Sequence, residues 1–410
     1  MTRDERALAT PWTRARALAH AAGTAAALAP EHVALLDASG RWLAADVVAP
    51  EPLPHFDSSA MDGWAVSGTG PWRLDMSSDD RMLAPPLAPG FARRVVTGQQ
   101  IPPGATAVVR SERASEDGGG EHGRLRLHPG TPDSEAAEGK HVRRAGAEAH
   151  RGETLVAAGV QLNPAQVALA AACGLDAVRV AASPPVALVL TGDEVVVSGR
   201  PRPGEVRDSF GPTLPPLLRM LGARPTITSR LGDDLGAIEE HLVGPEPLVC
   251  TTGGTGGSEV DHVRRALDDV GARLIIDGLA VRPGAPTVLA ELPDGRFVLA
   301  LPGNPLAAMV GLLLVGAPLL VGLAGRVLEP LPTVPVDLAA DRRHSGRAGG
   351  ADIVPFTAGP EGARPTGWTG AAMLRGLAAA DGLLVLESAG TTEASVLPLP
   401  WRTELIPPHR

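Results

Sequence analysis

Short apolar runs and amphipathic stretches alternate along residues 186–327. The runs VALVL, PLVC and FVLAL each lead into a polar loop that contains glycine, and a further strand is expected near 225–230. Helical spacing follows these strands, at 212–222, 234–243, 260–270 and from Pro305 onward. Strands and helices that alternate in this way form parallel βαβ units. The pattern therefore predicts a parallel α/β domain, which we place at 181–327.

The flanking regions have a different pattern. Residues 67–142 and the tail, 328–410, consist of short apolar runs between Pro- and Gly-containing turns, which is typical of β-structure. Helices are expected at 12–28 and 163–174, and a strand is expected at 41–49. An irregular loop is expected at 51–63, where the periodicity is lost. The fold class predicted is multidomain α/β plus β.

Composition narrows the class of protein. A chain of 410 residues with 44% hydrophobic and 20% charged residues is an ordinary globular protein of several domains. Its net charge of −9 argues against nucleic-acid and anionic-membrane partners, which require a basic surface. The apolar run at 306–327 follows a turn inside the α/β pattern, so we interpret it as a buried core helix. Cys173 and Cys250 are expected to be buried thiols of a cytoplasmic protein.

The glycine-rich loop at 251–261 is the strongest local sign of chemistry. It reads TTGGTGGSEVD and joins an apolar strand to a helix. Glycines such as Gly253 and Gly254 let the backbone approach a ligand, and hydroxyls such as that of Thr252 bind phosphate together with a helix N-terminus. A plain connection with capping residues is the alternative, and the density of glycines disfavours it. No Gly-Lys-Ser/Thr follows, so the loop is not a P-loop.

Two further loops end predicted strands at the same sheet edge. In 301–305, LPGNP, Asn304 can cap the next helix and Pro305 fits its first turn, so capping alone explains both residues. In 191–194, TGDE, adjacent carboxylates offer the oxygen ligands that Mg²⁺ prefers. Asp208 and Asp233 also follow predicted strands. Several carboxylates are thus expected to converge near a bound phosphate, which requires a cation.

Seven segments together resemble the molybdopterin molybdotransferase family, known as MoeA in bacteria and as the E domain of gephyrin in animals. They are FDSSAMDGWAV, RVVTGQQIPPGATAVV, RRAGAE, LTGDE, GGTGGSEVD, VRPGAP and ALPGNP, and they follow the family order over nearly the whole chain. The resemblance implies four domains: 1–47 with 143–180, an inserted β-rich domain at 48–142, the α/β domain, and a C-terminal β-barrel-like domain at 328–410.

The resemblance also implies a reaction and partners. Family members form a homodimer whose active site is shared between subunits, and they hand the cofactor on to biosynthetic or acceptor proteins. Their substrates are adenylylated molybdopterin and molybdate. The adenylate bond is hydrolysed in a Mg²⁺-dependent step, molybdenum is inserted, and AMP is released.

Site residues are carried over from the family position by position. The acidic positions, implied to be catalytic and to bind Mg²⁺, are Asp62, Glu194, Asp233 and Asp261. The positions implied to bind substrate are Thr97, Glu148, Asp208, Ser209, Thr252, Gly253, Gly254, Arg282, Pro302, Asn304 and Pro305. Asp62 and Thr97 are expected to reach the α/β site of the other subunit.

The chain departs from the family at several of these positions. The family run Lys-Pro-Gly-Lys-Pro reads RPGAP here, so Ala285 replaces a cation, and the region near Ala371 lacks a Ser that the family often has. Phe210 replaces an Asn beside Ser209. Because the acidic set and the three strand-end loops are retained, an active transferase is still the first hypothesis. A molybdopterin-binding paralogue or scaffold that inserts molybdenum poorly is the second, and a variant that uses tungstate is the third.

Overall fold

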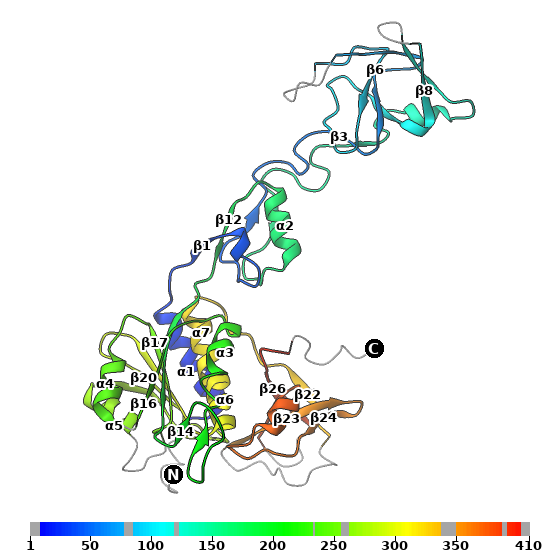
Figure 1. The fold of residues 1–410 in the computed structure, drawn as a ribbon. Coiled ribbons are helices and arrows are strands. Elements are labelled where there is room, and N and C mark those ends of the chain that lie inside the picture. The colour runs from blue at the N-terminus through cyan, green and yellow to red at the C-terminus, as the bar shows by residue number, and fades with distance from the viewer. Residues whose placement is uncertain are drawn as a thin grey trace. The chain divides into compact units, whose positions relative to one another are not determined.

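The computed structural model describes residues 9–77, 85–118, 123–232, 234–255, 262–337, 350–387 and 392–402. They divide into two compact units (Figure 1). Unit 1 combines the N-terminal residues up to Glu31 with the chain from Ala181 onward, and unit 2 is His32–Val180. Each unit has its own cores and is described by itself.

A mixed six-stranded sheet forms the centre of unit 1. Its strands, in spatial order, are β16 (Arg224–Leu231), β13 (Pro185–Thr191), β17 (Leu248–Thr252), β21 (Phe297–Leu301), β20 (Val288–Glu291) and β18 (Arg273–Asp277). The first four are parallel, as the sequence predicts, whereas β20 and β18 are antiparallel additions that the sequence reading missed. The domain is therefore mixed rather than purely parallel.

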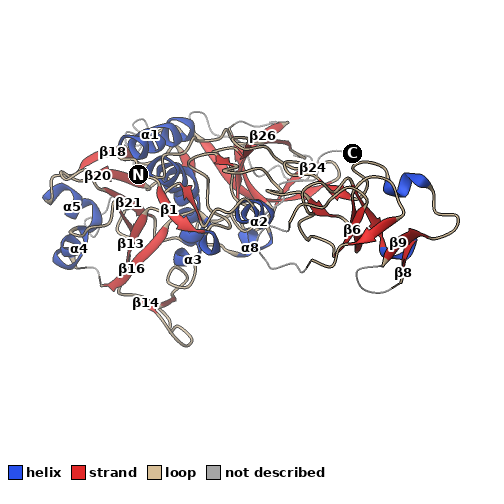
Figure 2. Ribbon diagram, turned by 90° about the horizontal axis from the view of Figure 1, so that it is seen from above, coloured by secondary structure: helices blue, strands red, loops and turns tan. Residues whose placement is uncertain are grey.

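Helices cover both faces of this sheet (Figures 1 and 2). On one face α4 (Leu235–Leu242) and α5 (His262–Asp269) bury Ile238, Val263 and Leu267 against alternate strand residues. The opposite face is covered by α1 (Trp12–Ala25), α3 (Leu214–Met220), α6 (Pro305–Gly311) and α7 (Ala317–Leu323). The predicted helices at 212–222, 234–243 and 260–270 are confirmed by α3, α4 and α5, and residues 260 and 261 lie outside the described residues.

The apolar run after the LPGNP turn is a core helix, as predicted. A π-helical segment (Leu312–Gly316) joins α6 to α7. The combined helix spans 19 residues with a mean hydropathy of 2.4, and 89% of its most apolar window is buried inside the protein. Its length and composition suit a membrane span, but its surface is already covered by the sheet and by α1.

Helix α1 packs on α7 at a close glycine crossing. A Cβ on Gly23 would lie 2.3 Å from the Leu319 carbonyl, and one on Gly322 would lie 2.4 Å from that of His20. The helix at 12–25 therefore belongs to unit 1, and the expected grouping of 1–47 with 143–180 as a domain stays a prediction. An apolar helix packs where a complementary groove exists, and sequence neighbourhood does not reveal that groove.

The C-terminal region of unit 1 forms a second sheet. It runs β19 (Val281–Arg282), β23 (Ala351–Gly359), β25 (Gly382–Leu386), β26 (Glu393–Pro398) and β22 (Thr333–Pro335), with β24 (Gly362–Pro365) paired to β23. Helix α8 (Arg375–Ala379) precedes β25. Ile353, Leu383 and Val385 enter the same core as α6 and α7, so the two sheets share a core. The predicted β-rich tail is confirmed, and its barrel-like closure stays a prediction. A short pair, β14 (Val195–Val196) and β15 (Val206–Arg207), lies outside both sheets.

Unit 2 contains a six-stranded sheet and several short strand pairs. The sheet runs β7 (Ala107–Arg110), β4 (Gly63–Val66), β6 (Phe91–Val95), β5 (Trp72–Leu74), β9 (Arg124–Leu127) and β8 (Ala114–Asp117). The pairs are β1 (Glu31–Ala34) with β12 (Ala177–Val180), β2 (Val47–Val48) with β11 (Thr154–Val156), and β3 (Ser58–Ser59) with β10 (Val142–Arg143). The β-rich character predicted for 67–142 is confirmed.

Local predictions in unit 2 vary in accuracy. Helix α2 (Pro164–Ala172) is confirmed, with a capping box in which Asn163 and Gln166 bond each other's backbone. The strand expected at 41–49 is wrong as one element, because only β2 and isolated bridges at Trp42 and Leu43 form. The loop expected at 51–63 contains β3 and leads into β4.

Candidate functional site

Three loops meet at the carboxyl edge of the parallel strands in unit 1. Strands β13, β17 and β21 are direct neighbours and run parallel, so their ends coincide. The Thr191 hydroxyl donates a hydrogen bond of 2.6 Å to the Thr252 carbonyl, and the Gly253 amide donates one of 3.0 Å to the Leu301 carbonyl. The predicted loops are thus bonded to one another. This edge is where open α/β sheets bind their ligands.

Close packing restricts two positions of the glycine-rich loop, 253 and 254, to glycine. Gly253 has a left-handed φ of +86°, and a Cβ there would lie 2.7 Å from Thr191 Oγ1. Gly254 has a φ of +62°, and its Cβ would lie 3.0 Å from a Val263 methyl group. Because glycine alone adopts both positions without strain, the backbone of this loop stays uncovered for close approach by a ligand.

Polar side chains at the end of β17 have unused hydrogen-bonding capacity. Thr251 and Thr252 are at most 1% exposed, and their hydroxyls find no hydrogen-bond partner within the described residues. A buried polar group without a partner costs about 1–3 kcal/mol. Such a cost is typical of a functional position, and the Thr252 hydroxyl lies beside the glycines of the loop.

The structure corrects the explanation of Asn304. This residue occupies the position before α6, yet its side chain makes no capping hydrogen bond. Only its carbonyl is used, as the acceptor of the Ala308 amide at 2.9 Å. Capping therefore explains Pro305, which occupies the first turn as expected, and does not explain Asn304. The exposed amide of Asn304 lines a cavity instead.

That cavity lies between the two sheets of unit 1 and has a volume of about 520 Å³. Its walls include the RPGAP loop, Pro302, Asn304 and residues 366–371. The RPGAP loop is tied to the C-terminal sheet, because Arg282 in β19 pairs with Asp352 in β23. Arg282 and Asp352 are the charged side chains among the described lining residues. Two positions that mark departures from the family, Ala285 and Ala371, line this same cavity.

The C-terminal region forms one wall of the cavity, which the sequence pattern does not predict. Trp368 lines the cavity with a left-handed φ of +50° and is 48% exposed. The Arg375 guanidinium lies 4.0 Å from the centre of its ring, which is a cation–π distance. An indole held in a backbone conformation that costs about 1–3 kcal/mol is typical of a functional site. One tryptophan in a Gly-rich turn carries no sequence periodicity that would have identified it.

Asp208 and Ser209 do not line this cavity. Asp208 forms an ion pair with Arg230 and accepts hydrogen bonds of 3.0 Å from the amides of Phe210 and Gly211. Its carboxylate therefore already holds the turn before α3. Ser209 lines a different, mainly apolar cavity of about 400 Å³, beside Met309. Pro305 also lines this second cavity.

The four acidic residues expected to bind Mg²⁺ are not assembled by the described residues. Glu194 is exposed in the loop after β13, whereas Asp62 belongs to unit 2. Asp233 and Asp261 lie outside the described residues. Within the described ranges, no three Asp, Glu, His or Cys side chains gather as a metal site.

Unit 2 brings two predicted site residues together. The amide and the hydroxyl of Thr97 donate hydrogen bonds of 2.7 Å and 2.8 Å to Asp62 Oδ1. These two bonds, the amide first, hold the pKa of the exposed Asp62 carboxyl below its ordinary value. Asp62 is thus an oriented carboxylate that faces solvent, with one oxygen engaged by Thr97.

Glu148 and the cysteines lie elsewhere. Glu148 is exposed, and its charge adds to burial in raising the pKa of the Cys173 thiol. Burial raises the pKa of Cys250 to about 12, so this thiol stays neutral. Both cysteines are buried, as expected.

Fold and site together define an α/β protein with ligand loops at parallel strand ends and a cavity against a second sheet. A family model described as the MoeA N-terminal region (domain I and II) matches residues 10–174. A second, described as a probable molybdopterin binding domain, matches residues 187–321.

Known proteins agree with these matches. Molybdopterin molybdenumtransferase 2 of Mycobacterium tuberculosis is 31% identical over 68% of this chain and 72% of its own length. Molybdopterin molybdenumtransferase of Synechococcus elongatus is 34% identical over 74% of this chain and 78% of its own length. The molybdopterin biosynthesis MoeA protein of Pyrococcus horikosii shares the fold, with a TM-score of 0.71 at 24% identity over 95% of this chain and 99% of that one. The chain therefore belongs to the MoeA family of molybdopterin molybdenumtransferases.

Proposed function

We propose that this protein acts in molybdenum cofactor biosynthesis as a molybdopterin molybdotransferase. Its substrates are adenylylated molybdopterin and molybdate, and its products are AMP and the molybdenum-loaded pterin. The observation that supports this most strongly is the bonded set of three strand-end loops. The Gly253 amide is bonded to the carbonyl of Leu301, which leads directly into Pro302 and Asn304 of the 520 Å³ cavity.

The two ends of the substrate need different surroundings, and unit 1 offers both. The adenylate phosphate suits the loop at Thr252, Gly253 and Gly254, where the glycines leave the backbone uncovered and the buried Thr252 hydroxyl has no hydrogen-bond partner among the described residues. The pterin suits the cavity, whose walls combine prolines with the amide of Asn304 and the guanidinium of Arg282. A guanidinium forms paired hydrogen bonds to planar or anionic groups.

The proposal includes Mg²⁺ and a homodimer. The acidic set offers the carboxylate oxygens that a hard divalent cation requires, although the described residues do not gather them. When bound, the cation would neutralise charge on the phosphoanhydride. In the dimer, the Asp62–Thr97 pair of one subunit would supply an oriented carboxylate to the loops of the other. The proteins that accept the cofactor, and a cytoplasmic location, belong to the same proposal.

Substitution of Asp261 tests the hydrolytic part of this proposal. Asp261→Asn keeps the shape of the side chain and removes its charge. We expect AMP release from adenylylated molybdopterin to fall by about a hundredfold or more, as when one charge-stabilising group is lost, with the melting temperature unchanged. A variant as active as the parent would remove Asp261 from the mechanism.

A weakened, molybdopterin-binding paralogue is the second candidate, because Ala285 and Ala371 leave the cavity with Arg282 as its cation among the described lining residues. If a missing cation limits the rate, Ala285→Lys should raise molybdate-stimulated AMP release by about tenfold, which is a fraction of what one oxyanion donor contributes. Ala379→Lys adds the same charge at an exposed site on α8 outside the cavity and should change nothing. No gain at Ala285 would mean that the existing arginine suffices.

A further inference from the structure

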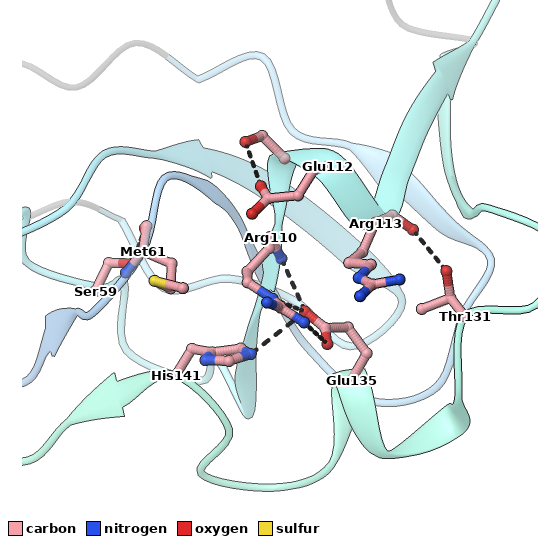
Figure 3. A network of polar contacts seen from close by, with 9 residues as sticks. Ser59, Met61, Arg110, Glu112, Arg113, Thr131, Glu135 and His141 are labelled. Carbon is pink, nitrogen blue, oxygen red and sulfur yellow. Dashed lines mark hydrogen bonds and ion pairs between the residues drawn. The ribbon is translucent and has the colours of Figure 1, made fainter.

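Unit 2 contains a buried charged network that the proposed reaction does not use (Figure 3). The Glu135 side chain is 3% exposed and accepts hydrogen bonds of 2.9 Å from both Nε and Nη2 of Arg110. The Arg110 amide donates a third, of 3.3 Å. His141 Nε2 lies 3.3 Å from Glu135 Oε1, which is an ion-pair distance, and makes no hydrogen bond among the described residues. We call Arg110, Glu135 and His141 the Glu135 network.

The two partners of Glu135 hold opposite ends of the segment that contains Asp62. At one end, the His141 carbonyl accepts the Ala60 amide at 2.9 Å. At the other end, Arg110 pairs with Gly63 in the ladder between β7 and β4. The amide of Ser111, the next residue in the chain, donates a hydrogen bond of 3.0 Å to the Asp62 carbonyl. Glu135 therefore links the two backbone anchors of residues 60–63.

Packing leaves this segment little freedom to adjust. A Cβ on Gly63 would lie 1.9 Å from the Val109 carbonyl, so β4 and β7 are in close contact where the segment enters the sheet. Ser59, fully buried, donates its hydroxyl to the Met61 carbonyl at 2.5 Å (Figure 3). A shift of either anchor is therefore transmitted to Asp62, whose carboxylate is the exposed part of the segment.

Stability alone is a weak explanation for these charges. Replacing a buried ion pair by apolar residues of similar volume is often neutral or stabilising. His141 also adopts a left-handed φ of +54°, which is unfavourable for a residue with a side chain. A network that is costly to bury and that includes a strained residue is expected to do more than hold the sheet together.

We infer that Glu135 is a positioning residue for Asp62. By joining Arg110 to His141 it fixes both ends of residues 60–63 and so sets the direction of the Asp62 carboxylate. This inference rests on the proposed function, in which that carboxylate serves the strand-end loops of a second subunit. Loss of the network should then reduce turnover and leave the binding of substrate, which occurs in unit 1, unchanged.

The test uses the full chain with an apolar replacement of the pair, Arg110→Met with Glu135→Leu, which preserves volume. Hydrogen exchange in peptides covering Ala60 and Ser111 measures how firmly the two backbone anchors are held. The kcat and KM for AMP release measure the effect on turnover and on substrate binding. We expect exchange about tenfold faster in these peptides alone, and kcat lower by about tenfold to a hundredfold with KM unchanged. Arg126→Gln, which breaks an exposed pair with Asp117 in the same sheet, should match the parent.

Each outcome is decisive for one of the two proposals. Parent-like exchange and parent-like kcat in a folded double variant would overturn the inference. If the double variant does not fold, Glu135→Gln replaces it, since that side chain keeps one acceptor oxygen where Arg110 now bonds two and loses the charge of the carboxylate. If the parent itself releases no AMP, the proposed function fails. The exchange rates then still decide whether Glu135 fixes residues 60–63.

Discussion

The strand-end loops of unit 1 and the Asp62 segment of unit 2 are held in place by different physical means. In unit 1, Gly253 and Gly254 fit because backbone and side chains leave no room for a Cβ, and buried aliphatic residues fill the sheet beneath them. In unit 2, Asp62 is held by Thr97, and the segment around it by the charged network at Glu135. Substitutions that change side-chain volume should therefore disturb the strand-end loops of unit 1 most. Substitutions that remove charge should disturb the Asp62 segment of unit 2 most.

The largest expected effect comes from adding one methyl group to the glycine-rich loop. Gly253→Ala forces a Cβ against Thr191 Oγ1, whereas Gly295→Ala is a matched control, because Gly295 has nearly the same φ of +85° and open space around it. We expect Gly253→Ala to weaken binding of adenylylated molybdopterin by about a hundredfold, or roughly 2.7 kcal/mol, and Gly295→Ala to leave it unchanged. Calorimetry measures both. Equal affinities would show that close packing does not shape the site.

An intermediate effect concerns acid stability in unit 2. Arg110, by hydrogen bonds and by charge, holds the pKa of Glu135 at about 2, below its ordinary value of 4.5. Because the folded-state pKa is the lower one, this stabilisation is complete above about pH 4.5 and is lost as the pH falls through 2. After allowance for solvent at the Arg110 end, Glu135→Gln should cost on the order of 2 kcal/mol at pH 7.

The pH dependence of that cost distinguishes charge from packing. Urea unfolding, followed by hydrogen exchange in unit 2, measures the free energy of unfolding of the parent and of Glu135→Gln. The difference between these two free energies should shrink at pH 2.5 to a fraction of its value at pH 7. Asp117→Asn, at an exposed pair, should show no such trend. A difference that stays constant with pH would mean that Glu135 acts through its shape, and the contrast between the two regions would weaken.

The smallest expected effect is at Thr97. Thr97→Val removes the hydroxyl bond to Asp62 Oδ1 and keeps the amide bond, so the pKa of Asp62 should rise part of the way to its ordinary value. Thr97→Ser keeps both bonds and should leave it unchanged. Titration followed by the carboxyl carbon resonance of Asp62 measures this shift. An unchanged pKa in the valine variant would assign the effect to the amide alone.

The sequence predicted the centre of the fold because local pattern and position agree there. The apolar runs of β13, β17 and β21, each followed by a polar loop with glycine, indicated both the strands and the edge where their loops meet. The antiparallel strands β18 and β20 are short and partly polar, so their sequences show no clear alternation of apolar and polar residues. The packing of helix α1 on α7 could not be predicted, because it depends on close contact between Gly23 and Gly322, which are far apart in the sequence.

The site was predictable where it is built from contiguous loops and not where it depends on long-range pairing. Asn304 matched a capping pattern, and only coordinates show that its amide is not used for that purpose. The pairing of Asp208 with Arg230, and that of Glu135 with Arg110 and His141, leaves no periodic trace because the partners lie on different strands and turns. Ala285 and Ala371 were noticed as separate departures, and their meeting in one cavity follows from the pairing of β19 with β23.

Release of AMP from adenylylated molybdopterin by the unaltered protein, with Mg²⁺ and with or without molybdate, tests the proposed function most directly. We predict that molybdate stimulates the release, with Arg282 sufficient as the cation of a cavity that contains Ala285. Tight binding of the substrate with no release under either condition would contradict this account, and the strand-end loops would then form the ligand pocket of a molybdopterin-binding protein.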